Sequence, residues 1–281
     1  MQAFFDSWPL FRETYLAAWW IAALLGLVGV LVVARDQIFV GAAISQASTL
    51  GIALGMCVGA AFAQEGSVWR SDAFLSVVAV AFAVGAALLI ARSSGIGKES
   101  HEAVTGFVYL LGASAAVLVI ARSPHGLDEV QKLAGSSVIG ASAVDVRIFA
   151  GLTLVTAVAV FVRRRALVLF AMDPLMARAV GVSRIWDGAA AAWLGLVMGM
   201  TIRSAGMLFS FGLLVLPALV AKNVCRATLP MFVVAPLVAV AASVAGFVAG
   251  NVSNQNEAQF TVALLCGLLA LAWLARSFRH A

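Results

Sequence analysis

The chain has 281 residues, of which 63% are hydrophobic and 11% are charged, and its formal net charge is +5 at pH 7. A soluble domain usually carries about 25% charged residues, so this chain has too few polar groups to cover a surface in water. The mean hydropathy of +1.04 arises from apolar stretches along most of the length. Composition therefore excludes a soluble globular protein and indicates an integral membrane protein.

Nine apolar segments follow one another along the chain. A helix needs roughly 20 apolar residues to cross the hydrocarbon core, where each backbone group must bond within its own segment. The segments lack the period of two that a β-barrel strand shows. We therefore expect an all-α bundle of eight or nine transmembrane helices in a single transmembrane domain, residues 1–281. The segments are Thr14–Ala34, Phe39–Ala63, Ala73–Ala91, Ala103–Ala121, Val144–Val162, Trp186–Ile202, Ala205–Ala221, Leu229–Gly250 and Phe260–Ala275.

The second segment differs from the others in its small and polar residues. Gly51, Gly55 and Gly59 recur at every fourth position, a spacing that allows helices to pack closely in a membrane. Uncharged polar residues stand at mid-segment: Ser45, Gln46, Ser48 and Thr49. Three of these, the two serines and the threonine, share a helical face. The pattern indicates either a face toward a water-filled path or ordinary interhelical hydrogen bonds, and a broken or re-entrant helix is also open.

Basic residues predict the orientation of the spans. With nine spans and the N-terminus outside, twelve Lys and Arg residues fall on the inside and six on the outside, which accounts for all 18. The positive-inside rule therefore favours an outside N-terminus and an inside C-terminus, and eight spans would change the parity. The first nine residues contain Asp6 and no Lys or Arg. We accordingly expect no cleavable signal peptide and insertion through the first span.

Two longer connections carry short helical patterns. In the outside connection Arg122–Ala143, residues Leu127–Ala134 suit either an amphipathic interfacial helix or a solvated surface helix. The inside connection Arg163–Ile185 is basic and contains Asp173-Pro174. Asp is a good N-cap and Pro a good first helical residue, so we expect a short helix that ends at Gly181. Such a short helix is unstable alone and needs a surface to pack on, either a partner protein or the bundle itself.

Motifs for catalysis or nucleotide binding are absent from the sequence. There is no P-loop, GxGxxG or HExxH motif, and His101, His125 and His280 have no ligand partner at helical spacing. The three cysteines form no CxxC pair, and ionisable residues stand near span ends rather than at mid-span. These features argue against a proton-coupled carrier, which needs buried acidic or histidine relays, and against a membrane hydrolase. Transport driven by another subunit remains compatible with them.

Five segments together resemble the transmembrane permease subunits of ABC importers for zinc, manganese and iron. Their order and spacing along the chain carry the resemblance, which covers nearly the whole length. They are Gly41–Gly55 (GAAISQASTLGIALG), Glu102–Gly106 (EAVTG), Leu133–Gly135 (LAG), Asp173–Val182 (DPLMARAVGV) and Gly206–Ala218 (GMLFSFGLLVLPA).

The resemblance implies a multi-pass permease of the bacterial inner membrane that works as a homodimer. The chain itself would be no enzyme and would hold no cofactor, because cytoplasmic ABC ATPase subunits bind the ATP. An extracytoplasmic solute-binding protein would deliver the substrate, and the path would run along the dimer interface past Ser45, Gln46, Ser48 and Thr49. The short inside helix, with Asp173, Pro174, Ala177 and Gly181, would dock on the ATPase, while nearby arginines meet acidic membrane lipid or the ATPase. No nucleic-acid partner is expected.

One departure from the family pattern bears on the substrate. Family members usually carry an Asp and a His four residues apart in the second span, where this chain has Ala42 and Gln46. Alanine offers no ligand, and the glutamine offers only a neutral carbonyl oxygen. The segment from Asn254 to Gln259 also differs from the acidic feature usual before the last span. A metal chelate or an uncharged solute is therefore an alternative substrate, and a stand-alone secondary carrier is a third interpretation.

Overall fold

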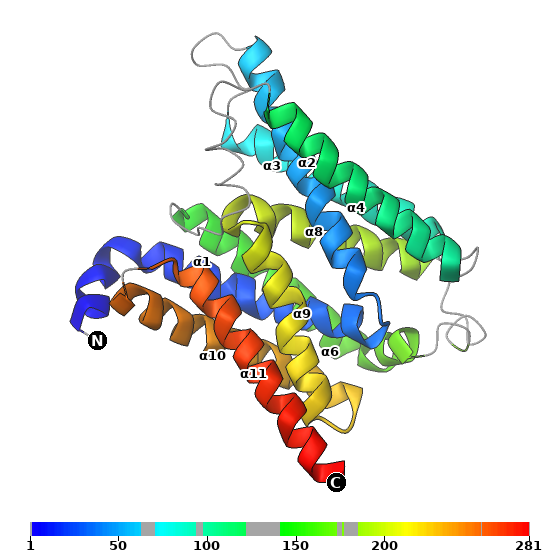
Figure 1. Ribbon diagram of the computed structural model, residues 1–281, viewed down its shortest axis with the longest axis vertical. Helices are drawn as coiled ribbons and strands as arrows, with labels where there is room; N and C mark the ends of the chain where they lie inside the picture. The colour runs from blue at the N-terminus through cyan, green and yellow to red at the C-terminus, as the bar shows by residue number, and fades with distance from the viewer. Residues whose placement is uncertain are drawn as a thin grey trace. The chain divides into compact units, whose positions relative to one another are not determined.

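The computed structural model describes residues 2–62, 71–93, 98–121, 141–172, 176, 185–253 and 255–280 (Figure 1). Regular structure within these ranges is helical, as the apolar segments predict. The helices are α1 (Gln2–Ala34), α2 (Ile38–Phe62), α3 (Asp72–Ser93), α4 (Lys98–Ile120), α6 (Ala143–Met172), α8 (Ile185–Ala205), α9 (Met207–Val224), α10 (Thr228–Ser253) and α11 (Glu257–His280).

Eight of these helices are long and apolar enough to cross a membrane, and α8 is the described helix outside that group. The prediction of eight or nine transmembrane helices is therefore confirmed. The outside pattern Leu127–Ala134 and the residue His125 lie outside the described residues. The helix α1 begins at Gln2, well before the apolar segment.

The chain divides into two compact units, which are described one at a time. The first unit comprises Met1–Gln37, Ser136–Val182 and Leu208–Ala281, and so contains α1, α6, α10, α11 and nearly all of α9. The second comprises Ile38–Gly135 and Ser183–Met207, and so contains α2, α3, α4 and α8. The expectation of a single transmembrane domain stays a prediction.

In the first unit, α1 is the central helix and α10 runs antiparallel to it. At one end Asn251 of α10 donates a hydrogen bond to the Tyr15 hydroxyl at 3.3 Å. Further along, a Cβ on Gly26 would lie 2.8 Å from the Cα of Pro236. The backbone of α1 also touches that of α9, where a Cβ on Gly29 would collide with the Leu214 carbonyl. Small residues thus let these helices pack backbone to backbone.

The long helix α6 runs parallel to α1 within the same unit. About two and a half turns into each apolar stretch, the Thr153 hydroxyl donates to the Trp20 carbonyl at 3.1 Å. At their far ends, the Arg35 guanidinium lies 4.4 Å from the centre of the Phe170 ring. The helix bends at Arg163, whose φ of −104° and ψ of 16° are not helical. This bend falls where the apolar segment predicts the span to end.

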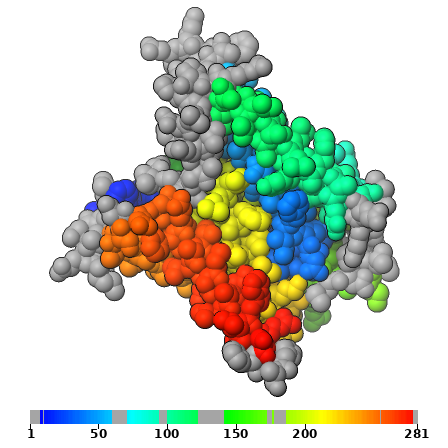
Figure 2. Space-filling model, in the orientation of Figure 1, coloured from blue at the N-terminus to red at the C-terminus, as the bar shows by residue number. Residues whose placement is uncertain are grey.

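In the second unit, α2 packs against α3, α4 and α8, and α8 packs along α3. Figure 2 shows α4 (green) lying over α2 (blue). A Cβ on Gly195 or Gly199 of α8 would lie 2.7 Å from the Cα of Val84 or Val80 of α3, respectively. These pairs run in opposite directions along the two helices, so α8 and α3 are antiparallel in close contact.

Two residues with positive φ mark the tight junctions between helices. Gly206 separates α8 from α9 with a φ of 81°, a conformation that costs an L side chain roughly 1–2 kcal/mol. Asp36 follows α1 with a φ of 53°, which aspartate tolerates better than most residues. Its carboxylate also accepts a hydrogen bond from Lys222 Nζ at 2.9 Å.

Candidate translocation segment

The polar residues predicted to line a path all lie on α2, which is continuous from Ile38 to Phe62. The alternative of a broken or re-entrant second span is therefore wrong. Two of its hydroxyls bond within the helix: Ser45 Oγ donates to the Gly41 carbonyl at 2.8 Å, and Thr49 Oγ1 donates to the Ser45 carbonyl at 3.0 Å. Such i to i−4 bonds satisfy a hydroxyl without help from another helix.

Ser48 differs from these two because its hydroxyl has no such bond. The residue is fully buried, and its Oγ has no hydrogen-bond partner among the described residues. A buried polar atom without a partner costs about 1–3 kcal/mol, and such atoms are rare in native structures. Ser48 therefore places an unused donor and acceptor in the middle of a membrane helix.

Gln46, one residue after Ser45, makes the contact that connects α2 to the start of α9. Its side-chain Nε2 donates to the thioether Sδ of Met207 at 3.1 Å, while the residue itself stays half-buried. The other amide atom, Oε1, has no hydrogen-bond partner among the described residues. Sequence reasoning missed Met207 as a site residue, because nothing in the Gly206–Ala218 motif indicates that its second residue faces α2.

Close packing holds the polar segment from two sides. On α4, a Cβ on Gly112 would lie 2.8 Å from the carbonyl carbon of Gln46. Toward α3, a Cβ on Gly51 would lie 2.9 Å from the Phe82 Cβ. The glycine spacing in the sequence predicts this close packing, and the structure identifies its neighbours. The backbone that carries Gln46 and Ser48 is thus fixed by helix contacts on both sides.

The chemistry that this segment offers is neutral. Its atoms are hydroxyls, an amide oxygen and a thioether sulfur, and α2 carries no charged residue. In the described part of the chain, no three His, Cys, Asp or Glu side chains come close enough to hold a metal ion. Oxygen atoms of this kind contact hard cations and a thioether suits soft ones, but neither balances a divalent charge. The segment can contact a passing solute without forming a charged metal site.

A second feature that sequence reasoning missed is an ion pair at one end of the second unit. The carboxylate of Asp72, the first residue of α3, pairs with Arg203 in the last turn of α8. Asp72 is 91% exposed and Arg203 27% exposed, and the Arg203 Nε is buried without a hydrogen-bond partner in the described part. The pair joins the ends of the two antiparallel helices, and the sequence places them 131 residues apart.

The residues predicted to dock on an ATPase, Asp173, Pro174, Ala177 and Gly181, lie outside the described residues. Met176 is the described residue of this segment: it is helical and its side chain is 54% exposed. The docking role thus stays a prediction.

These observations define a polytopic, all-helical membrane protein with an uncharged polar segment on a buried helix. A family model described as the ABC 3 transport family matches residues 7–276. The chain belongs to this family, which confirms the assignment to permease subunits of metal-ion ABC importers made from the sequence.

Curated relatives are similar at modest identity. The manganese transport system membrane protein MntB of Synechocystis is 26% identical over 216 residues, which cover 74% of this chain and 65% of that protein. The manganese transport system membrane protein MntC of Halalkalibacterium halodurans is 23% identical, over 96% of this chain and 89% of that protein. The chelated iron transport system membrane protein YfeD of Yersinia pestis is 23% identical over 85% of this chain and 76% of that protein.

Two solved structures share the fold. PsaBC from Streptococcus pneumoniae, in complex with Fab, superposes with a TM-score of 0.78 at 20% identity, over 97% of this chain and 95% of that one. A metal-chelate type ABC transporter in an inward-facing conformation gives a TM-score of 0.69 at 18% identity, over 94% of this chain and 85% of that one.

Proposed function

We propose that this chain is the membrane-spanning subunit of an ATP-driven importer for a divalent metal ion: zinc, manganese or iron. The family match over residues 7–276 carries the proposal, because relatives matched at similar length are named for manganese or iron transport. Two copies of the chain would form the path between them, partly along α2. Two cytoplasmic ATPases would supply the energy, and an extracytoplasmic solute-binding protein would supply the ion.

Nine spans in the bacterial inner membrane, with the N-terminus outside, fit this proposal best. The helix α8 is outside the group of eight described helices that are long and apolar enough to cross, but it packs antiparallel against the span α3 through Gly195 and Gly199. A helix shielded by such contacts needs fewer apolar side chains to cross a membrane. If α8 is a span, the nine spans place the N-terminus outside and the C-terminus inside. This is the orientation that the basic residues favour.

Coupling to the ATPase is assigned to the segment that holds Asp173, Pro174, Ala177 and Gly181. Replacing Ala177 and Gly181 with glutamate is expected to abolish co-purification of the ATPase, because both small residues would stand at a closely packed surface. Ala143→Glu, an exposed site at the opposite end of α6, is the matched control. Equal recovery of the ATPase with all variants would remove the docking role.

A second candidate substrate, a metal chelate or an uncharged solute, is favoured by one observation. Gln46 bonds to Met207 and offers no charged or imidazole ligand. The segment therefore does not replace the water ligands that a bare divalent ion gives up when it enters the path. A solute that keeps its own ligands needs only small polar contacts such as those of Ser48. A solved structure of the same fold is named as a metal-chelate type transporter.

Uptake in proteoliposomes separates the candidates. The full chain, its ATPase and its binding protein are reconstituted, and ATP-dependent uptake of radiolabelled manganese or zinc is compared with uptake of the same metal in a chelate. Saturable uptake of the bare ion supports the first candidate, whereas uptake only of the chelate supports the second. Uptake without any ATPase would contradict both and support a secondary carrier.

Gln46→His sharpens this test. Imidazole is a strong ligand for zinc, so this variant is expected to raise uptake of bare zinc about tenfold if the neutral amide limits it. Gln46→Leu removes both the hydrogen bond and the polarity and is expected to lower uptake of either substrate. Transport that is the same in both variants and in the wild type would show that Gln46 lies off the path.

A further inference from the structure

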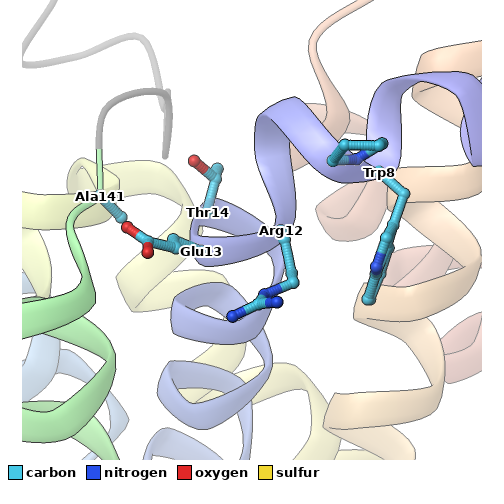
Figure 3. A pocket seen from close by; sticks show the side chains of 6 residues that line it. Trp8, Arg12, Glu13, Thr14 and Ala141 are labelled. Atoms are coloured by element: carbon cyan, nitrogen blue, oxygen red, sulfur yellow. The ribbon is translucent and has the colours of Figure 1, made fainter.

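A pocket at the amino-terminal end of α1 lies apart from the candidate translocation segment. It has a volume of about 410 Å³ and is lined by Trp8, Pro9, Arg12, Glu13, Thr14 and Ala141. Figure 3 shows these side chains projecting from α1, with Ala141 just before α6. The described lining residues belong to the first unit.

The pocket presents two opposite charges that do not neutralise each other. Arg12 and Glu13 are both exposed, and neither forms an ion pair with a described residue. Adjacent residues on a helix point about a quarter-turn apart and do not face each other. A ligand that satisfies both must carry an anionic group and a cationic group a short distance apart.

Thr14 places a polar atom in the wall of the pocket. The residue is only 5% exposed, it lines the pocket, and its hydroxyl has no hydrogen-bond partner among the described residues. A threonine in a helix usually bonds to a carbonyl one turn earlier, as Thr49, Thr105 and Thr153 do in this chain. The Thr14 hydroxyl is therefore available to a ligand in the pocket.

The pocket lies where the apolar stretch of α1 begins. The membrane-spanning part of α1 begins at Phe11. The Trp8 ring packs at 5.9 Å from Tyr15 and 5.8 Å from Trp19, an aromatic cluster typical of the interface between headgroups and acyl chains. Six residues beyond Thr14, and thus about 9 Å deeper, Trp20 is 39% exposed. Apolar surface for acyl chains thus continues from the pocket along α1.

We propose that this pocket binds the headgroup of phosphatidylethanolamine. Arg12 would donate hydrogen bonds to the phosphate, while the Glu13 carboxylate and the adjacent Thr14 hydroxyl, away from Arg12, would accept them from the primary ammonium. The same headgroup chemistry exists in free phosphoethanolamine, but a lipid also uses the exposed apolar surface around Trp20. The inference does not depend on which solute the protein carries.

Lipid binding to the purified full-length chain tests the proposal. Native mass spectrometry compares phosphatidylethanolamine, phosphatidylcholine and phosphatidylglycerol with the same acyl chains, with free O-phosphoethanolamine as competitor. Phosphatidylethanolamine is expected to bind about tenfold more tightly than the other two, because only its headgroup joins a phosphate with an ammonium that donates hydrogen bonds. The soluble competitor is expected to displace little lipid.

Variants separate the two charged contacts. Glu13→Gln is expected to weaken phosphatidylethanolamine about tenfold and to leave phosphatidylglycerol unchanged, whereas Arg12→Gln weakens all three lipids. Thr14→Val, of nearly equal shape, is expected to weaken phosphatidylethanolamine about fivefold. Arg147→Gln is the matched control, because Arg147 is exposed near the start of α6 but does not line the pocket. Unchanged thermal unfolding shows that each variant is folded.

Four results would overturn the proposal. Equal binding of phosphatidylethanolamine and phosphatidylcholine by the wild type would show that the pocket does not recognise the headgroup. An unchanged affinity of folded Glu13→Gln for phosphatidylethanolamine would show the same. Full displacement by O-phosphoethanolamine would assign the pocket to a soluble zwitterion. Reduced affinity of Arg12→Gln and Glu13→Gln for the solute-binding protein, with lipid binding intact, would assign it to protein docking.

Discussion

The helices α1 and α2 are the most buried spans of the two units, but they are buried by different means. In the most apolar stretch of α1, 72% of the residues are buried, against 61% for α2. From Leu16 to Ala34, α1 carries no hydroxyl, amide or charged side chain, and it packs through glycines against Pro236 and Leu214. The helix α2 also packs through glycines, but it carries four polar residues between Ser45 and Thr49.

The difference indicates separate roles for the two helices. Burying an unpaired hydroxyl reduces stability, which favours a functional role where other polar side chains stand beside it in the helix, as they do for Ser48 but not for Ser243 of α10. The Leu16–Ala34 stretch of α1 contains no hydroxyl, and its unpartnered polar atom among the described residues is the Trp19 indole Nε1. We therefore assign structural packing to α1 and solute contact to α2.

Gly29→Leu in α1 should have the largest effect on stability. The new side chain would collide with the Leu214 carbonyl, which is backbone and cannot rotate away. We expect the free energy of unfolding to fall by roughly 3 kcal/mol, measured by thermal unfolding in detergent. Gly151→Leu in α6 is the control, because a Cβ there meets nothing within 4 Å. Similar losses in both variants would contradict the packing role of Gly29.

Ser48→Ala and Ser243→Ala form a matched pair for transport. Both serines are fully buried with an unpartnered hydroxyl, Ser48 in α2 and Ser243 in α10. Removing an unpaired hydroxyl should leave both variants within about 1 kcal/mol of wild-type stability. We expect Ser48→Ala to lower ATP-dependent uptake about tenfold, a barrier change of about 1.4 kcal/mol, and Ser243→Ala to leave it unchanged. Equal uptake by both variants would refute the assignment of Ser48 to the path.

Gly206→Ala should destabilise the chain by about 1 kcal/mol, because the φ of 81° at this junction is unfavourable for a residue with a Cβ. Gly85→Ala in α3 is the control: it lies within a helix, and its Cβ would meet nothing within 4 Å. The control should keep or raise the unfolding temperature. A Gly206→Ala protein as stable as the control would show that this junction adapts without strain.

The ion pairs at the helix ends should contribute least. Asp72→Asn removes the pair with Arg203 in the second unit, and Asp36→Asn removes the pair with Lys222 in the first. Both aspartates are more than 80% exposed, so each change should cost about 0.5 kcal/mol or less and vanish at high salt. A loss above 2 kcal/mol for either would show that its carboxylate is desolvated in the membrane.

Much of the fold follows from the sequence because the bilayer leaves few choices. Nine apolar segments predict the nine described helices, with boundaries that differ mainly at the ends. The start of α1 was missed, since residues 2–10 form helix although they include Pro9 and Asp6. The apolar segment that ends at Val162 predicts the position of the bend at Arg163. It does not predict that the helix continues beyond the bend to Met172.

The class of protein, the order of the helices and the neutrality of the polar segment on α2 all follow from the sequence. These properties depend on composition and on short spacings in the sequence. An apolar segment in lipid forms a helix because a helix satisfies all its backbone hydrogen bonds internally. The tertiary structure alone decided which side chains meet. Gln46 and Met207 are 161 residues apart, and Thr14 lines a pocket with Ala141. Many helix pairs in this chain have small residues that permit close contact, so spacing does not select among them, and only the packed bundle does.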